Sequence, residues 1–284
     1  MTAEQDEGAF KALTQQISRA RGFSCEAYKN KCLRRRIAVR MRARGVHSFE
    51  DYGRLLDQDA HEYDLLLDAL TINVTKFYRN PETWTALTET HLPALWRAAA
   101  GRLRAWSAGC ASGEEPYTVA VVLAEAARGA GDDAGTALVD ATDVDRVSLE
   151  KTRAAAWPES AFTEMPQALV RRYFTEGPPG AAPPLPPSPP PLRRAVPALQ
   201  RLVRVLKHDL VREAPPNPPY DLIVCRNVVI YFDRSTQERL FARFAEALRP
   251  GGLLVLGKVE TLLGTARERL ELLDPRERIY RRPE

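Results

Sequence analysis

The spacing of apolar residues changes along the chain and divides it into two parts. From Phe10 to about Leu70 the spacing is helical, and no stretch has the alternation of a strand. From Leu103 onward, short apolar runs alternate with helical stretches. This order predicts an α/β fold with a mainly parallel, doubly wound sheet. The length of 284 residues suits about two domains.

The individual elements follow from short runs and their boundaries. We predict helices at 29–44, 48–56, 62–70, 117–128, 147–156 and 235–248, and another from Pro81 toward Trp96. Strands are predicted at 103–106, 136–143, 201–210, 220–227, 253–256 and 276–281, with a turn at 250–252. The run from Pro178 to Leu192 is saturated with proline, which lacks the N–H that a sheet ladder needs. We therefore place it in a surface insertion, as a spacer or, alternatively, as a ligand for an SH3-type domain.

The stretch 103–128 combines a strand, a glycine loop and a helix. Gly109 lies in the loop, and Pro116 suits the first helical turn, where its missing N–H needs no partner. This arrangement lets backbone approach a nucleotide-like ligand. Because Glu114 and Glu115 stand at the helix N-terminus, a phosphate would meet like charges, whereas the cationic S-adenosylmethionine (SAM) would be attracted. The alternative is that both glutamates simply favour the helix dipole.

Polar residues at the predicted strand ends supply further candidate ligands. Asp143 ends one strand, where a carboxylate can accept both hydroxyls of a ribose, and Asp145 is its neighbour without that role. Asp209 ends the next strand, and Arg226 and Asn227 follow the near-continuous apolar run of the strand after it. These side chains are therefore expected at the edge where an open α/β sheet binds its ligand.

A short segment between the two parts of the chain holds Asn73, Thr75 and Arg79. Asn and Thr offer neutral hydrogen-bonding groups, and Arg offers a fixed fork for a carboxylate. Phe77 and Tyr78 are expected to wall a pocket. The alternative interpretation of this segment is a polar connector between helices.

The predicted helix 29–44 holds eight basic residues and no acidic one. Its apolar residues recur every four positions, so one stripe can pack while the rest stays cationic; they are Leu33, Ile37 and Met41. Such a helix favours an acidic partner, nucleic acid or protein, and the alternative is a solvated helix without a partner. The lack of interleaved aromatic residues and the modest net charge of +4 argue against nucleic acid.

Composition excludes several classes of protein. The four cysteines stand far apart without a CxxC pair, and the four histidines are scattered, so neither a metal site nor a disulfide scaffold is expected. No apolar run approaches the roughly 20 residues of a membrane span. The acidic start MTAEQDEGAF lacks the apolar core of a signal peptide, so we expect a cytosolic protein.

Five blocks, in their positions along the chain, carry a resemblance: NVTKFYR, WSAGCASGEEPY, TDVD, IVCRNVVIYFD and LRPGGLLVLGKVE. They resemble the chemotaxis CheR family, SAM-dependent protein-glutamate methyltransferases that act on chemoreceptors. The resemblance implies a helical N-terminal domain, residues 1–70, and a Rossmann-like methyltransferase domain, residues 71–284, with an insertion at about 165–200. It also implies a cytoplasmic enzyme that binds the helical bundle of a receptor and needs no metal; we expect a monomer.

The resemblance implies which residues form the site, because the family's motifs can be matched to this sequence position by position. The residues implied to contact the cofactor are Asn73, Thr75, Arg79, Gly109, Glu115, Asp143, Asp209, Leu210, Arg226 and Asn227. Among these, Glu115 would hold the amino group, Asp143 the ribose, and Asp209 with Leu210 the adenine. Tyr231 would stand near the transferred methyl. The implied docking residues for the receptor, on the basic helix, are Arg34, Arg35, Arg36 and Arg40.

The expected chemistry needs no general base. A glutamate carboxylate, with an ordinary pKa of about 4.3, is already ionised at neutral pH. Arg79 is expected to orient a carboxylate of substrate or cofactor, and Tyr231 to position the accepting oxygen. The alternative for Tyr231 is a buried aromatic residue with a satisfied hydroxyl.

The sequence departs from the family pattern at four places. Asp209 stands where Asn is usual, Phe77-Tyr78 replaces Phe-Phe, LGKVE replaces LGHSE, and the proline-rich run falls where the family carries a small antiparallel subdomain. Two rival functions stay open: a cofactor-binding regulatory module without turnover, and a methyltransferase for small acids or nucleic acid. The NPPY at 217–220 precedes a strand, so it cannot place a tyrosine at the strand's ligand-binding end.

Overall fold

A computed structural model describes residues 3–71, 75–176 and 192–284. The chain forms two compact units. The first comprises Met1–Ile72 together with Ile230–Gln237, and the second comprises Asn73–Val229 with Glu238–Glu284. Each unit is described separately below.

The first unit is helical, as the apolar spacing predicts. Its described helices are α1 (Ala3–Arg21), α2 (Asn30–Ala43), α3 (Phe49–Gln58) and α4 (Ala60–Leu70), with a short 3₁₀ turn η1 (Cys25–Ala27). Ser48 caps α3 by accepting a hydrogen bond from the Asp51 amide. The predicted apolar stripe of α2 is confirmed, because Leu33, Ile37 and Met41 are all buried in the core of this unit.

A segment from much later in the chain belongs to this helical unit. The Lys29 amide donates to the Tyr231 carbonyl at 2.9 Å, and the Asp233 amide donates to the Ala27 carbonyl at 2.9 Å. The rings of Tyr28 and Phe232 pack edge to face with centroids 4.8 Å apart. The segment Ile230–Gln237 is thus held by backbone and aromatic contacts to the start of α2.

The second unit is built on a mixed sheet with the strand order β6-β2-β1-β7-β8-β10-β9. Its strands are β1 (Arg104–Ala108), β2 (Leu138–Asp143), β6 (Val203–Lys207), β7 (Tyr220–Cys225), β8 (Leu248–Leu256), β9 (Glu271–Asp274) and β10 (Ile279–Arg281). The first five strands in this order pair in parallel, and β10 runs antiparallel to both of its neighbours. The predicted α/β fold is confirmed, with an antiparallel edge added.

The C-terminal part of the sheet corrects two predictions. The expected turn at 250–252 lies inside β8, where Gly251 has φ +77° and the register against β7 shifts. The register shift shows that the strand bulges at these glycines instead of ending. A Cβ on Gly252 would lie 2.9 Å from the Arg249 carbonyl oxygen, so a larger residue would not fit there without a shift. The edge strand β9 was not predicted.

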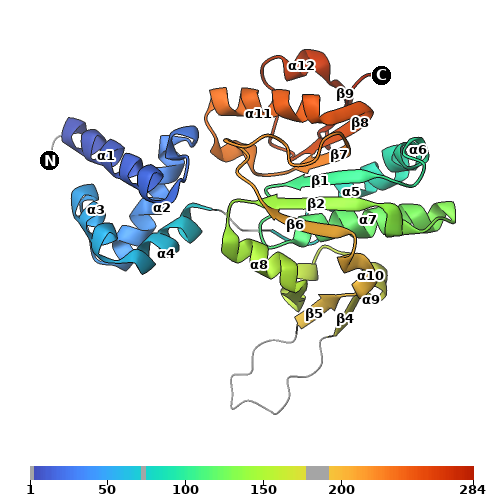
Figure 1. Ribbon diagram of the computed structural model, residues 1–284, viewed down its shortest axis with the longest axis horizontal. Coiled ribbons are helices and arrows are strands. Elements are labelled where there is room, and N and C mark those ends of the chain that lie inside the picture. The colour runs from blue at the N-terminus through green and yellow to red at the C-terminus, as the bar shows by residue number, and fades with distance from the viewer. Residues whose placement is uncertain (1–2, 72–74, 177–191) are drawn as a thin grey trace, which may run out of the picture. The chain divides into compact units, whose positions relative to one another are not determined.

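Helices cover both faces of the sheet (Figure 1). On one face Ala105 of β1 and Leu222 of β7 lie in the same buried hydrophobic cluster as the apolar residues of α7 (Glu114–Ala130). Trp106 points to the other face, where its ring lies 5.4 Å from Phe244 of α11 (Arg234–Ala247). All six residues of the central strand β7 are buried, as its continuous apolar run predicts.

The remaining elements connect and cover the sheet. The helices are α5 (Pro81–Ala86), the π-helix η2 (Leu87–His91), α6 (Leu92–Ala98), α8 (Arg146–Ala154), α9 (Gln167–Tyr173), α10 (Pro197–Gln200) and α12 (Ala266–Arg269). The 3₁₀ turns are η3 (Ala134–Thr136), η4 (Glu159–Phe162) and η5 (Val229–Tyr231). Pro81 stands at the first position of α5, as predicted.

A second, small antiparallel sheet lies between β2 and β6 in the chain. It has the strand order β3-β5-β4 and consists of β3 (Ala156–Pro158), β4 (Phe174–Glu176) and β5 (Leu192–Ala195). The proline-rich run falls between β4 and β5 and lies outside the described residues. The chain therefore has both the antiparallel subdomain and the proline-rich insertion.

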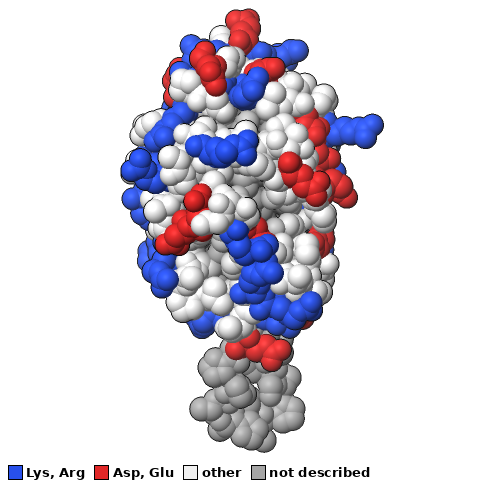
Figure 2. Space-filling model, turned by 90° about the vertical axis from the view of Figure 1, so that its right-hand side faces the viewer, with Lys and Arg blue, Asp and Glu red and all other residues white. Residues whose placement is uncertain are grey.

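The outer surface carries charges of both signs. Figure 2 shows Lys and Arg side chains spread over one face with Asp and Glu side chains among them. Many are paired, such as Arg172 with Glu125 and Arg281 with Glu271, each at 2.7 Å. No helix of the described residues is long and apolar enough to cross a bilayer.

Candidate cofactor site

The parallel strands bring the predicted site residues to one edge of the sheet. Ala108 pairs with Thr142 and Asp143 with Lys207, so β1, β2 and β6 end level with one another. Ser107 pairs with Val224 near the end of β7. The loops that follow these strands form the edge at which such a sheet binds its ligand.

The glycine loop that follows β1 is tightly constrained. The amides of Gly109 and Cys110 both donate to the Thr142 carbonyl at 2.9 Å, which fastens the loop to the end of β2. Gly109 has φ +82°, and a Cβ there would lie 2.7 Å from Cγ2 of Val228. Only glycine fits this position without a shift of the chain.

Helix α7 begins three residues before its predicted start. Gly113 has φ +101° and stands directly before the helix, so Glu114, Glu115 and Pro116 form the first turn. Proline is tolerated there because its missing N–H would have no intrahelical partner. Both carboxylates are therefore part of the helix N-terminus, not of the loop.

The two glutamates have different surroundings. Glu114 is buried, and its carboxylate accepts a hydrogen bond from the Ser112 hydroxyl at 2.7 Å. Glu115 is partly exposed, and its Oε1 accepts from the Ser107 hydroxyl at 2.8 Å. Burial raises the pKa of Glu115 to about 7; the charges of Arg226 and Arg79 and the Ser107 hydrogen bond oppose this shift, and Glu260 adds to it.

Asp143 keeps hydrogen-bonding capacity at the end of β2. Its Oδ2 accepts from the Ala111 amide at 2.8 Å, and its Oδ1 accepts from the Asp145 amide at 3.0 Å. An ionised carboxylate has about four acceptor positions, so both oxygens can accept again. Burial raises the pKa of Asp143. Asp145 has a structural role, since it caps α8 by accepting from the Val147 amide and the Ser148 hydroxyl.

Strand β6 ends at Lys207, two residues before the predicted strand end at Asp209. The His208 amide donates to the Asp143 carbonyl at 2.9 Å, which keeps this turn beside β2. The Asp209 Oδ1 accepts from the Val211 amide at 2.8 Å, so the side chain folds over its own turn. Leu210 follows and is 8% exposed.

Arg226 and Asn227, directly after β7, have separate roles. The Arg226 guanidinium is buried, and it donates to the Arg79 carbonyl at 2.8 Å and to Asn80 Oδ1 at 2.9 Å. It also lies 5.3 Å from the centre of the Trp84 ring. Asn227 has φ +60°, and its buried Oδ1 has no hydrogen-bond partner among the described residues. Arg226 thus holds the protein's own backbone, and Asn227 presents a buried acceptor.

Residues 8–71 of the chain match the CheR methyltransferase all-alpha domain, and residues 73–279 match the CheR methyltransferase SAM-binding domain. The chain belongs to the CheR methyltransferase family. A chemotaxis protein methyltransferase of Klebsiella aerogenes is 33% identical over 261 residues, covering 91% of this chain and 85% of the relative. Chemotaxis protein methyltransferase 2 of Pseudomonas aeruginosa is 32% identical, covering 89% of this chain and 86% of the relative. That of Listeria monocytogenes is 31% identical, covering 89% and 90%.

The site of this CheR-family protein fits SAM by its donor and acceptor groups. Asp143 has free acceptor positions for the two ribose hydroxyls, and the buried Asn227 Oδ1 needs a donor. Glu115 is an acidic group whose burial a cationic ligand would offset. Among the described residues no group of three or more His, Cys, Asp or Glu side chains could hold a metal ion.

The segment with the NxTxFxR motif is partly a core element in this CheR-family protein. Asn73 lies outside the described residues, and Thr75 and Arg79 are partly exposed. Phe77, predicted to wall a pocket, is fully buried and stacks on Phe162 at 4.5 Å between ring centroids. This prediction was wrong because Phe77 packs in an aromatic cluster that residues of the inserted subdomain provide.

The predicted docking arginines and Tyr231 belong to the first unit. Three of these arginines make contacts inside it: Arg34 pairs with Asp6 and Glu7, Arg40 pairs with the buried Glu62, and Arg36 donates to the Ala69 carbonyl. Arg35 is exposed, and the part of the unit that the structure describes shows no ion pair for it. The basic helix of this CheR-family protein is therefore partly a structural element.

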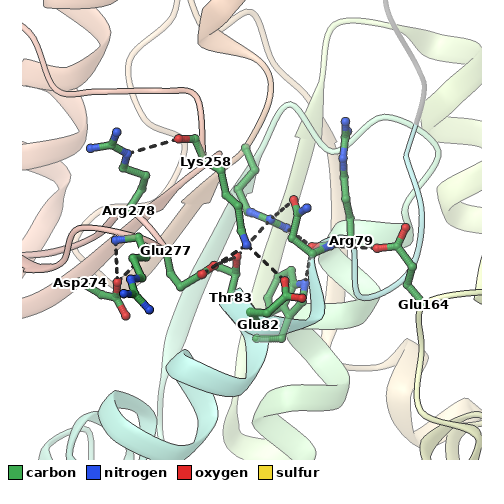
Figure 3. Close-up of polar contacts among 12 residues, drawn as sticks. Arg79, Glu82, Thr83, Glu164, Lys258, Asp274, Glu277 and Arg278 are labelled. Atoms are coloured by element: carbon green, nitrogen blue, oxygen red, sulfur yellow. Dashed lines mark hydrogen bonds and ion pairs between the residues drawn. The ribbon is translucent and has the colours of Figure 1, made fainter.

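Sequence reasoning missed several residues around the site. Ser107 donates to Glu115, and Glu260 is buried and accepts from the amides of Gly257 and Asn227 at 2.6 and 2.9 Å. Lys258 and Glu277 form an ion pair in a polar cluster with Glu82 and Thr83 (Figure 3). The LGKVE motif, in which this chain departs from the family pattern, is the sequence signal that could have drawn attention to Lys258 and Glu260.

Proposed function

We propose that this protein transfers a methyl group from SAM to glutamate side-chain carboxylates of chemoreceptors, giving methyl esters. The observation that carries the proposal is the carboxylate of Glu115 in the first turn of α7, at the ligand edge of the sheet, where it accepts from the Ser107 hydroxyl. An anion in this position disfavours phosphate-bearing cofactors and favours a cationic one. The relatives are chemotaxis protein methyltransferases, and they suggest the substrate class.

The chain's own residues would hold the cofactor in defined roles. Glu115 would accept from its ammonium group, Asp143 would accept from the ribose hydroxyls, and the Asn227 Oδ1 would gain the donor that it lacks. Asp209 with Leu210 would flank the adenine, and Gly109 would let the backbone approach. When bound, SAM supplies an electrophilic methyl group on a sulfonium.

The acceptor needs alignment instead of activation. A glutamate carboxylate is ionised at neutral pH, so no side chain has to remove a proton. Alignment alone can contribute roughly 7–11 kcal/mol to lowering the barrier. We assign Arg79 to orient a carboxylate. Tyr231 belongs to the first unit, and its role at the accepting oxygen stays a prediction from the sequence.

The exposed face of α2 would dock the receptor. Lys31, Arg35 and Arg42 are exposed and recur at helical spacing, so they form one cationic stripe. Receptor methylation regions are glutamate-rich helical bundles, and such an acidic surface would be attracted to this stripe at low ionic strength. Arg34, Arg36 and Arg40 would support the helix from within. The protein would act as a monomer in the cytoplasm.

The test is incorporation of labelled methyl groups from SAM into receptors of the host. We expect label on glutamate side chains that is released by mild alkali, as an ester requires. Binding of SAM without any transfer to receptors would support the regulatory module instead. Transfer of label to small acids or nucleic acid, with receptors unmodified, would refute the proposed substrate.

A further inference from the structure

Five side chains form a polar cluster beside the proposed cofactor site, here called the Lys258 cluster: Lys258, Glu82, Glu277, Thr83 and Arg226. The Lys258 ammonium lies 3.2 Å from a carboxylate oxygen of Glu82 and 3.2 Å from one of Glu277. Figure 3 shows Lys258 between these two carboxylates. All five residues belong to the second unit.

The cluster continues from Lys258 to the backbone of Arg79. The Thr83 hydroxyl, fully buried, donates to Glu277 Oε2 at 2.5 Å. Arg226 Nη2 lies 3.5 Å from the Thr83 hydroxyl, and Arg226 Nη1 donates to the Arg79 carbonyl. A chain of contacts thus runs from Lys258 through Glu277, Thr83 and Arg226 to the segment that carries Arg79.

The charges in the Lys258 cluster are unequally exposed. The Glu82 side chain is 67% exposed and its pair is screened by water, whereas the Glu277 side chain is only 10% exposed. Lys258 therefore serves mainly to neutralise Glu277. Burial lowers the pKa of Arg226 and the charge of Arg79 adds to this shift, whereas the carboxylates of Glu115, Glu260 and Glu277 oppose it.

We propose that Lys258 is a positioning residue: by neutralising Glu277 it keeps Arg226 on the Arg79 and Asn80 acceptors and so preserves the cofactor site beside Glu115. This inference rests on the proposed function for the identity of the ligand.

Removal of the cation has a defined consequence. In Lys258→Met the buried Glu277 carboxylate has lost the cation that lies 3.2 Å from it, and the Arg226 guanidinium, which interacts electrostatically with Glu277, remains beside the Thr83 hydroxyl. Arg226 is then drawn toward Glu277 and away from the Arg79 carbonyl and from Glu115. The segment 77–80 loosens, and Glu115 loses part of the positive field that favours its ionised form.

The experiment measures binding of S-adenosylhomocysteine by calorimetry across pH, and amide hydrogen exchange in the ligand-free protein. We expect Lys258→Met to weaken binding about 3–10-fold, because the cluster couples Lys258 to Arg226, and to raise the pH midpoint of binding. The amides of Phe77, Tyr78 and Asn80, each hydrogen-bonded in the native fold, should exchange faster.

Matched variants separate positioning from general destabilisation. Lys258→Arg keeps the cation and should bind like wild type. The double variant Lys258→Met/Glu277→Gln removes anion and cation together and should return to within about twofold of wild type, because Arg226 is no longer drawn away. Glu271→Gln breaks an exposed ion pair on the edge strand β9 and should change neither readout.

The inference would be overturned by Lys258→Met with wild-type affinity, pH midpoint and exchange, or by a double variant that binds as weakly as Lys258→Met alone. A lower melting temperature with an unchanged midpoint and unchanged exchange would also overturn it. If the wild type does not bind S-adenosylhomocysteine, the cofactor assignment fails, and the exchange data still decide whether Lys258 holds the segment 77–80.

Discussion

Glu115 offers the sharpest test of the proposed cofactor site, through the substitution Glu115→Gln. This change keeps the shape of the side chain and an acceptor for the Ser107 hydroxyl but removes the charge. Burial raises the pKa of Glu115 from 4.5 to about 7, which corresponds to roughly 3 kcal/mol against the ionised form at about 1.4 kcal/mol per unit. A bound ammonium would offset part of this cost.

The pH dependence of binding follows from this shift. The ligand-free protein holds the proton on Glu115 below about pH 7, and the ammonium group of the ligand pairs with the ionised form. Affinity for S-adenosylhomocysteine should therefore rise by up to about tenfold per pH unit toward pH 7 and level off above it. Calorimetry from about pH 5.5 to about pH 8 measures this, and Glu115→Gln should bind weakly with a flat profile.

The contribution of Glu115 to the free energy of unfolding should fall over the pH range in which the affinity rises. The pKa is raised in the folded state, so this proton stabilises the fold fully below about pH 4.5, and the contribution is lost as pH rises to about 7. Glu115→Gln should match the wild type near pH 4 and exceed its unfolding free energy by up to about 3 kcal/mol above pH 7. Urea unfolding measures the difference. A variant with wild-type affinity at every pH would refute the reasoning.

Three further predictions concern other parts of the molecule. Arg79→Ala should abolish methyl transfer while the melting curve stays cooperative, and unchanged turnover would remove its assigned role. Gly109→Ala should destabilise the fold by about 1–3 kcal/mol, because φ is +82° and the new Cβ would clash with Val228; in urea unfolding, Gly109→Ala/Val228→Ala should recover part of the loss. Arg35→Glu/Arg42→Glu should slow receptor methylation several-fold at low salt and less at high salt, with unchanged affinity for S-adenosylhomocysteine. Equal rates at all salt concentrations would exclude docking by this stripe.

The sequence predicted the elements whose pattern is local. Apolar spacing located the buried stripe of α2 and the central strand β7, because both patterns are complete within one segment. The bulge at Gly251 was taken for a turn, since proline and glycine mark both and only pairing with β7 distinguishes them. Strand β9, four residues at the sheet edge, has too short a pattern to stand out.

The candidate site could be predicted only in part, for a similar reason. Asp143 and Asn227 could be named as candidates because a polar residue that follows an apolar strand is visible in the sequence. The burial of Phe77 depends on Phe162 and Phe174, which lie far away in the chain. The partners of Arg34 and Arg40 on the basic helix are equally distant, so a run of arginines did not reveal which of them are used within the fold.

The structure explains why two of the family's motifs depend on each other. Arg226, from the CRN motif, donates to the carbonyl of Arg79, the last residue of NxTxFxR, and the indole of Trp84 donates to the same oxygen at 3.1 Å. One motif therefore supplies the support for the backbone of the other. The Arg226 guanidinium donates to this carbonyl and to Asn80 Oδ1, so it keeps the backbone of the Arg79 segment in place. A loss of Arg226 should consequently remove the contribution of Arg79 as well, so that the two losses in cofactor affinity are not additive.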